Sequence, residues 1–336
     1  MKRLYTRKIL FIAISLLIIT IGIKIHSAIT FPQITDWNYR QLQKIDKKAK
    51  NFSFAVFGDN KNSITTFENL INAVNLDDVM FSIDIGDLVQ DGEKEKYKFF
   101  INQIKEFKKP LLTAIGNHEL RENGRGNYYD LFGRFYYSFT IGDAYFIILD
   151  DANEYNLDPW QMEWVREQLE KALKYKYRFV FMHVPLFDPR KEGPRIAHNL
   201  KDIRFANQLN ALFDKYNITM CFASHIHAYY RGMWNRTPYI ITGGAGAELV
   251  GINPEHDFYH YIKVNVSGDT GVSYEVKKIQ SPDFEVIDRL MHDAWIYAYS
   301  FFAIHYMDVA LAIIILYLSL YLFLVMKKKT IRGHRC

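Results

Sequence analysis

Carboxylate, amide and imidazole side chains recur in this sequence directly after short apolar runs. Such runs, ended by glycine or a polar residue, are typical of buried strands. Because the carboxyl ends of strands in an α/β sheet form one crevice, we expect the side chains that follow them to lie together. These side chains are Asp59, Asp87, Asn117, His183, His225 and His227.

This set of donors is suited to binding transition metals. Two aspartates, one amide and three histidines give mixed oxygen and nitrogen ligands, which favour Mn, Fe, Zn or Co over Ca or Mg. His225 and His227 are two residues apart, so in extended backbone both imidazoles point to the same face. The set is large enough for two divalent metal ions about 3.5–4 Å apart, the arrangement that stabilises an in-line displacement at phosphorus. Each piece alone has a blander explanation, such as a turn or a core histidine, so the prediction depends on their joint order.

The elements that must position these side chains alternate between strand and helix and end in strands. This pattern predicts an α/β fold with two packed sheets and helices outside them. Strands are predicted at 52–57, 79–85, 111–115, 136–141, 144–149, 177–182, 218–223, 239–242, 259–266 and 272–279, and helices at 63–74 (with Ser63 as N-cap), 93–107, 160–174 and 200–216.

The order of these pieces resembles that of the calcineurin-like metallophosphoesterases, over about residues 52–280. The resemblance implies a four-layer α/β-β/α sandwich, in which two mixed sheets are flanked by helices. The segments that carry it are Gly58-Asp59, Gly86-Asp87 with Asp91-Gly92, Gly116-Asn117-His118-Glu119, His183, and His225-Ile226-His227.

The resemblance also implies a role for each site residue. Asp87 would bridge two metals, and His118 would hold the phosphate or protonate the leaving oxygen. A metal-bound hydroxide would attack the phosphorus of a phosphomonoester, phosphodiester or pyrophosphate. Asp59 and His227 would complete the first metal site, and Asn117, His183 and His225 would bind the second metal.

Two features depart from the pattern of this family. The family usually has a histidine two residues after the first aspartate, where this chain has Lys61. The purple acid phosphatase branch also lacks that histidine, and the stretches 227–231 and 243–246 resemble that branch. However, the iron-ligating tyrosine of that branch would fall at Gln90, so we expect no tyrosinate-coloured iron centre.

Three further residues are candidates for binding the substrate. Lys61 either contacts a substrate phosphate or is a solvated loop lysine. Arg121 follows the Asn-His-Glu turn, and His198 lies in a loop containing Pro189, Gly193 and Pro194. For Arg121 and His198 the alternative is an ordinary surface residue.

The net charge first suggests a nucleic-acid partner, but its distribution removes that support. The chain of 336 residues has 42 Lys and Arg against 37 Asp and Glu, a formal charge of +5. Nine of the basic residues lie in the segments 1–8 and 327–336, which contain no acid. The remainder is slightly acidic, so no nucleic-acid binding is expected. A hydrophobic content of 49% excludes a disordered chain.

Each basic tail borders an apolar run. Residues 1–31 are predicted to be a basic tail followed by a membrane anchor, with a cleaved signal peptide as the alternative. Residues 303–326 are predicted to be a transmembrane helix, and 327–336 a basic cytoplasmic tail. Because basic residues stay in the cytoplasm, both termini are expected there and the part between them outside it.

Between the two apolar runs we expect three further parts. These are a linker at 32–50, a metallophosphoesterase domain at 51–282 and a juxtamembrane helix at 283–302. Anchoring near the membrane favours a lipid-linked or envelope phosphate as the substrate, with a soluble substrate that reaches a tethered enzyme as the alternative. The alternative function is a metal-poor, non-catalytic interaction scaffold, because the first metal site lacks one ligand and a fold does not fix a function.

Overall fold

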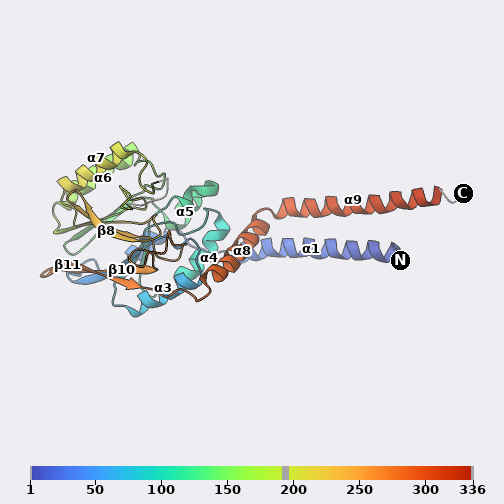
Figure 1. The fold of residues 1–336 in the computed structure, drawn as a ribbon, viewed down its shortest axis with the longest axis horizontal. Helices are drawn as coiled ribbons and strands as arrows, with labels where there is room; N and C mark the ends of the chain where they lie inside the picture. Colours follow the sequence, from blue (N-terminus) through green and yellow to red (C-terminus); the bar gives the residue numbers. More distant parts are fainter. Residues whose placement is uncertain (1, 191–196, 334–336) are drawn as a thin grey trace. The chain divides into compact units, whose positions relative to one another are not determined.

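The computed structural model describes residues 2–190 and 197–333. It divides into two compact units, one formed by Gln33–His292 and the other by Met1–Pro32 together with Asp293–Cys336 (Figure 1). The first unit contains both sheets and all of the candidate site residues.

Two mixed sheets form the centre of the unit Gln33–His292. In the first sheet the strand order is β11-β10-β1-β2-β3, and in the second it is β4-β5-β6-β7-β9-β8. The strands of the first sheet are β1 (Phe52–Phe57), β2 (Phe81–Asp84), β3 (Leu111–Thr113), β10 (His260–Ser267) and β11 (Gly271–Lys278). Those of the second are β4 (Tyr137–Ile141), β5 (Ala144–Ile148), β6 (Tyr177–Phe181), β7 (Met220–Ala223), β8 (Tyr229–Trp234) and β9 (Thr237–Thr242).

Helices cover the outer face of each sheet (Figure 1). Helices α3 (Thr65–Leu76) and α4 (Lys94–Ile104) lie on the first sheet, where the Phe67 ring packs 6.1 Å from that of Phe57 on β1. Helices α6 (Pro159–Ala172) and α7 (Ile203–Lys215) bury Leu169 and Phe213 against the second sheet. The predicted four-layer α/β-β/α sandwich is therefore confirmed.

Phenylalanine fills the space between the two sheets. The buried rings of Phe54 on β1 and Phe179 on β6 meet edge to face at a centroid distance of 5.5 Å. Phe181 and Phe222 stack at 5.1 Å on neighbouring strands of the second sheet. Because side chains alternate between the two faces of a strand, the phenylalanines of one face form the core between the sheets. The polar residues of the candidate site come after the carboxyl ends of these strands.

The structure differs from the predicted elements in several places. Ser63 is not an N-cap: α3 begins at Thr65, and its capping residue Ile64 makes no side-chain cap. The expected linker contains α2 (Trp37–Leu42), whose Asn38 amide accepts from the backbone N–H of Thr113 at 2.8 Å. Three further elements were not predicted, namely β8, the 3₁₀ turn η1 (His118–Asn123) and α5 (Arg125–Phe132).

The other unit consists of helices from both ends of the chain. Helix α1 (Lys2–Thr30) and helix α9 (Tyr306–Gly333) lie side by side (Figure 1). Arg7–Thr30 and Tyr306–Met326 are long and apolar enough to cross a membrane, with mean hydropathies of 2.4 and 2.8. Helix α8 (Glu285–Ile304) precedes α9, and its Tyr299 hydroxyl lies 3.0 Å from Nδ1 of His26 on α1.

Candidate metal centre

The candidate ligands all follow the carboxyl ends of strands, and both sheets contribute to them. Asp59, Asp87 and Asn117 follow β1, β2 and β3 of the first sheet. His183 follows β6 of the second sheet, and the segment containing His225 and His227 follows β7. The parallel pairing of β1 with β2 and of β6 with β7 brings the loops of each sheet to one edge.

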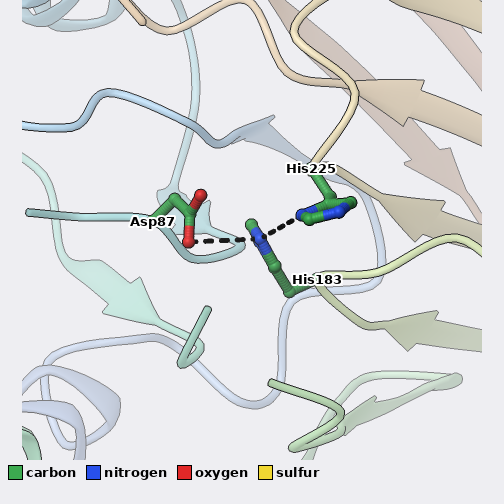
Figure 2. A group of neighbouring side chains, drawn as sticks. All are labelled: Asp87, His183 and His225. Carbon is green, nitrogen blue, oxygen red and sulfur yellow. Dashed lines mark hydrogen bonds and ion pairs between the residues drawn. The ribbon is translucent and has the colours of Figure 1, made fainter. Parts of the chain in front are cut away.

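Asp87, His183 and His225 form the first group of possible metal ligands (Figure 2). Oδ1 of Asp87 lies 3.2 Å from Nε2 of His183, which in turn lies 3.3 Å from Nδ1 of His225. The amide oxygen of Asn117 is 3.0 Å from the same His183 nitrogen and 3.1 Å from the same His225 nitrogen. Four donor atoms therefore converge on one point.

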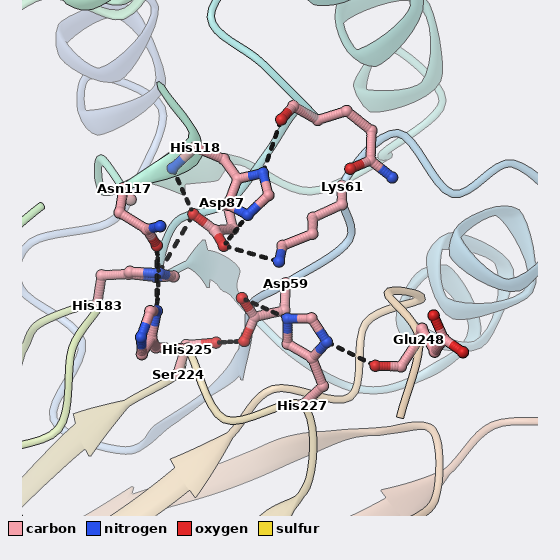
Figure 3. Close-up of polar contacts among 12 residues, drawn as sticks. Asp59, Lys61, Asp87, Asn117, His118, His183, Ser224, His225, His227 and Glu248 are labelled. Atoms are coloured by element: carbon pink, nitrogen blue, oxygen red, sulfur yellow. Dashed lines mark hydrogen bonds and ion pairs between the residues drawn. The ribbon is translucent and has the colours of Figure 1, made fainter. Parts of the chain in front are cut away.

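Asp59, Asp87 and His227 form the second group, and Asp87 is shared between the two (Figure 3). Oδ1 of Asp59 lies 3.7 Å from Nε2 of His227. Nδ1 of His227 bonds the backbone carbonyl of Glu248, which orients the ring with Nε2 toward the aspartates.

The buried oxygen atoms of these groups fit cations. Oδ1 of Asp59 and Oδ2 of Asp87 are buried and have no hydrogen-bond partner among the described residues. Burying a carboxylate oxygen without a partner is costly, whereas a coordinated cation would satisfy it. Mixed carboxylate, amide and imidazole donors around a shared aspartate fit two divalent transition-metal ions.

The backbone at these loops adopts conformations that are rare for side-chain-bearing residues. Asp59 has a φ of 61°, Asp87 of 57° and His225 of 66°. Gly86 has a φ of 102°, and a Cβ atom there would lie 2.8 Å from Nδ1 of His183. Glycine before Asp87 therefore permits both the turn and the close approach of the second sheet's histidine. Left-handed residues clustered in one place are typical of functional sites.

Burial shifts the pKa values of the site residues in different directions. It raises the pKa of Asp59 to about 6 and lowers the pKa of His227 to about 3, so the His227 imidazole is neutral at pH 7. Burial also acts to raise the pKa of Asp87 and to lower that of His183. However, the attraction between Asp87 and His183 holds the pKa of Asp87 well below its usual value and raises the pKa of His183 to about 10. A cation bound between them would displace the proton on His183.

Three buried residues hold the candidate ligands in place. Oε2 of Glu119 accepts the backbone N–H groups of Gly116 at 2.7 Å and Asp87 at 2.9 Å, which joins two of the loops. Both carboxylate oxygens of Asp151 accept backbone N–H groups at 2.8 Å, those of His183 and Val184. Because these bonds fix backbone rather than side chains, they set the direction in which Asp87 and His183 point.

The third supporting residue is Ser224, which links the two sheets. Its hydroxyl donates to Oδ2 of Asp59 at 2.6 Å, leaving Oδ1 of Asp59 to face the site. Sequence reasoning assigned no role to Ser224, Asp151 or Glu119. The signal for Ser224 was its place directly before His225-Ile226-His227, and that for Glu119 its place at the end of Asn117-His118-Glu119. Asp151 had no signal beyond following a strand.

The remaining predicted site residues lie at different depths. His118 is buried, with Nε2 3.7 Å from Oδ2 of Asp87 and Nδ1 2.7 Å from the carbonyl of Gln90. The Lys61 ammonium lies 3.3 Å from the same Asp87 oxygen. The ring of His198 is 5.4 Å from that of His225. Arg121 is half exposed and points to Asp91 at 3.9 Å, so the structure does not bring it to the ligand cluster.

Comparison with known proteins agrees with this geometry. The family model described as calcineurin-like phosphoesterase matches residues 52–229, more than half of the chain. The chain belongs to the calcineurin-like phosphoesterase family. Membership of this family makes it a metal-dependent hydrolase of phosphoric esters.

Several known proteins resemble this calcineurin-like phosphoesterase in sequence. The 3',5'-cyclic adenosine monophosphate phosphodiesterase CpdA of Haemophilus influenzae is 23% identical over 237 residues, covering 66% of this chain and 84% of CpdA. Purple acid phosphatase 23 of Arabidopsis thaliana is 26% identical over 165 residues, covering 42% of this chain and 35% of that enzyme. The match to the purple acid phosphatase thus spans about a third of its length.

Solved structures support the fold. Purple acid phosphatase PPD1 from yellow lupin (Lupinus luteus) has a TM-score of 0.51 at 18% identity, covering 72% of this chain and 56% of that one. The Plasmodium protein GAP50, titled the anchor in the inner membrane complex, has a TM-score of 0.52 at 15% identity, covering 73% and 95%.

Proposed function

We propose that this protein is a membrane-anchored phosphoesterase with two divalent metal ions. Its catalytic unit, Gln33–His292, would lie outside the cytoplasm. The observation that carries the chemical part is the shared position of Asp87. Its carboxylate belongs to both ligand groups, and its Oδ2 accepts no hydrogen bond among the described residues, with the Lys61 ammonium 3.3 Å away. When bound there, two cations would lower the pKa of a water molecule and neutralise the charge of a phosphate.

The side chains around the cations have separable tasks in this proposal. Asp59, Asp87 and His227 would hold one ion, and Asp87, Asn117, His183 and His225 the other. Nδ1–H of His118 donates to the carbonyl of Gln90, so Nε2 faces the site and would bind or protonate the leaving oxygen. Burial lowers the pKa of His118 to about 4, and a phosphate beside it would raise that pKa toward neutrality.

Lys61 and His198 are proposed as contacts for the substrate phosphate. Both lie beside the ligand groups, and Nδ1 of His198 is buried without a hydrogen-bond partner among the described residues. Arg121 is retained as a candidate at the rim, since its exposed guanidinium could turn from Asp91 toward a larger substrate.

The proposed substrates are phosphomonoesters, phosphodiesters or pyrophosphates. Similarity to a protein named as a cyclic nucleotide phosphodiesterase and to purple acid phosphatases supports both ester classes. Two apolar helices that could cross a membrane make a lipid-linked phosphate a natural substrate to include.

The chemistry is tested with the purified full chain and aryl phosphates. In buffer containing Mn²⁺, the wild type should hydrolyse an aryl phosphomonoester or diester, and Asp87→Asn and His225→Ala should each remove most of that activity. Metal analysis of the same samples should find metal in the wild type and less in Asp87→Asn. Full activity in both variants would contradict the proposal. If the wild type is active and the variants are not, a screen of lipid, nucleotide and sugar phosphates identifies the substrate class.

The topology is tested separately. Cys336 is replaced by serine, and Leu173 on the surface of the catalytic unit is replaced by cysteine. If the unit lies outside the cytoplasm, a membrane-impermeant maleimide added to intact cells should label Leu173→Cys. Labelling that requires broken cells would place the unit in the cytoplasm.

The second candidate function is a non-catalytic interaction scaffold. The observation that favours it is the Lys61 ammonium beside Asp87, where a second cation would otherwise sit. This alternative predicts no stoichiometric transition metal in the purified protein and no hydrolysis with added Mn²⁺. The enzyme hypothesis predicts bound metal and hydrolysis.

A further inference from the structure

The first turns of helix α8 have their polar and apolar faces reversed relative to a helix on the surface of a soluble domain. Their outward side chains are large and apolar. On the helix, the exposed fractions are 73% for Val286, 60% for Ile287, 66% for Leu290 and 67% for Met291, and Phe284, directly before the helix, is 75% exposed. We call these five residues the α8 apolar face. Since they recur with helical spacing, they form one stripe rather than scattered exposures.

The charged side chains of the same turns are directed inward and are bound by the catalytic unit. Asp288 accepts a hydrogen bond from the hydroxyl of Thr65 at 3.0 Å, at the start of α3. Glu285 accepts from the hydroxyl of Tyr259 and from that of Ser281, and Arg289 pairs with Glu285 at 3.2 Å. These contacts fix the rotation of the helix, so the apolar stripe cannot turn toward the protein.

A stripe of this size that none of the described residues covers is typical of a surface that contacts another body. The chain itself suggests which body. Helix α8 runs on to Ile304, and α9 begins at Tyr306 with a segment long and apolar enough to span a bilayer. Residues 284–291 precede Tyr306 by 15 to 22 positions, so they reach the lipid headgroups if α8 lies along the membrane surface, where aromatic and apolar side chains partition favourably.

We propose that the α8 apolar face inserts into the interfacial layer of a lipid bilayer. The polar face of α8 would then be bound to the catalytic unit and its apolar face to lipid, so the helix would fasten the unit to the membrane surface beyond the tether of α9. This inference rests on the proposed membrane anchoring but is independent of the proposed chemistry.

The experiment uses the full chain in nanodiscs of phosphatidylcholine and phosphatidylglycerol. Cys336 is replaced by serine, while Cys221 is fully buried and is left in place. An environment-sensitive fluorophore is attached at Leu290→Cys. Leu316→Cys in α9 serves as the positive control, and Leu173→Cys after α6, on the outer face of the other sheet, is the matched exposed leucine. Each sample is then compared with and without nitroxide lipids, which carry the nitroxide near the headgroup in one set of nanodiscs and at the middle of the acyl chain in another.

Lipid contact predicts quenching at Leu290→Cys several-fold above that at Leu173→Cys and of the same order as at Leu316→Cys. Quenching at Leu290→Cys equal to that at Leu173→Cys would overturn the proposal. A disulfide-linked dimer of Leu290→Cys without quenching would also overturn it, because a second copy would then cover the face. Failure of quenching at Leu316→Cys as well would overturn the anchoring on which the proposal rests. Hydrolysis of an aryl phosphate by each labelled variant checks its folding and reports on the chemistry separately.

Discussion

The ammonium of Lys61 lies 3.3 Å from Oδ2 of Asp87, on the carboxylate that both ligand groups share. Asp87 also belongs to the group formed with Asp59 and His227, so the lysine and a cation bound there would compete for the negative charge of this carboxylate. The group formed with His183 and His225 has one more donor in the Asn117 amide. The two candidate metal sites therefore differ in the number of donor atoms and in the positive charge beside them.

We expect Lys61→His to strengthen binding of the metal ion at the group formed by Asp59, Asp87 and His227. The substitution removes the competing positive charge and adds an imidazole, so the second equivalent of Mn²⁺ should bind ~10- to 100-fold more tightly. Titration calorimetry of the metal-free protein measures both equivalents. Lys61→Gln, which removes the charge without adding an imidazole, should fall between the wild type and Lys61→His. Equal affinities in all three proteins would mean that the ammonium does not compete.

Metal binding should stabilise the catalytic unit as a whole, because the ligands come from both sheets of the sandwich. At a free metal concentration about 100-fold above the dissociation constant, one site adds about 2.7 kcal/mol to the free energy of unfolding. A chelator should therefore lower the unfolding temperature, and Mn²⁺ should restore it. Asp87→Asn is the control, since its unfolding temperature should respond weakly to either treatment.

Removing His118 should affect substrates according to their leaving groups. If Nε2 of His118 protonates the leaving oxygen, His118→Ala should slow hydrolysis of alkyl phosphates ~10²- to 10⁴-fold and that of activated aryl phosphates much less. Comparing kcat across esters of graded leaving-group pKa measures this. His256→Ala, a histidine whose ring bonds the carbonyl of Tyr229, is a matched substitution away from the ligands and should leave the ratio unchanged. Equal losses on both kinds of ester would point to a role in binding phosphate alone.

Glu119→Gln should destabilise the protein although it is nearly isosteric. The wild-type carboxylate accepts N–H groups of Gly116, Asp87 and Val89, whereas the Gln amide would turn an NH₂ group toward at least one of them. Leaving a buried donor unpaired costs about 1–3 kcal/mol in the free energy of unfolding. Urea denaturation of Glu119→Gln and of the exposed control Glu122→Gln, from the same turn, measures the difference. A loss no larger than that of the control would show that the carboxylate is not needed there.

Asp77 should make stability depend on pH in the acidic range. Burial acts to raise the pKa of Asp77, but hydrogen bonds from Lys263 and Tyr261 hold it below 3.8, its usual value. A carboxyl whose pKa is lower in the folded state stabilises that state above the unfolded pKa and loses the effect as the pH falls. Asp77→Asn should therefore have a lower free energy of unfolding than the wild type at pH 7. This difference should shrink as the pH falls below 3.8. Urea denaturation at several pH values measures this difference, and a difference that does not change with pH would exclude this explanation.

The candidate site was predictable because its signals are local. A glycine followed by an acid at the end of an apolar run indicates the carboxyl end of a strand. The carboxyl ends of parallel strands lie at the same edge of their sheet, so residues that follow them lie close together. The same reasoning found Asp59, Asp87 and the pair His225/His227, all of which the structure brings together. The roles proposed for them stay predictions.

What the sequence did not reveal depends on distant contacts. Asp151 supports His183 across 32 positions of the chain, and no local pattern marks that pairing. Strand β8 was missed because it is an edge strand with a half-exposed face, so its residues lack the alternation of a half-buried strand. The expected cap at Ser63 was wrong because its neighbourhood is set by tertiary contacts. Its carbonyl accepts from Gln103 on α4, and its hydroxyl makes no bond to the first turn of α3.

Strand β1, the first of the catalytic unit, pairs antiparallel with β10 near the end of that unit, where Phe52 lies opposite Val266. During synthesis the nascent chain must therefore carry β1 with one open edge until almost the whole unit has been made. The family match ends at residue 229, before β10 and β11. A chain shortened to that limit would keep all six candidate metal ligands but expose the edge of β1, a known route to aggregation. The folding domain thus extends well past the segment by which the family is recognised, up to the helix that leads into the second apolar span.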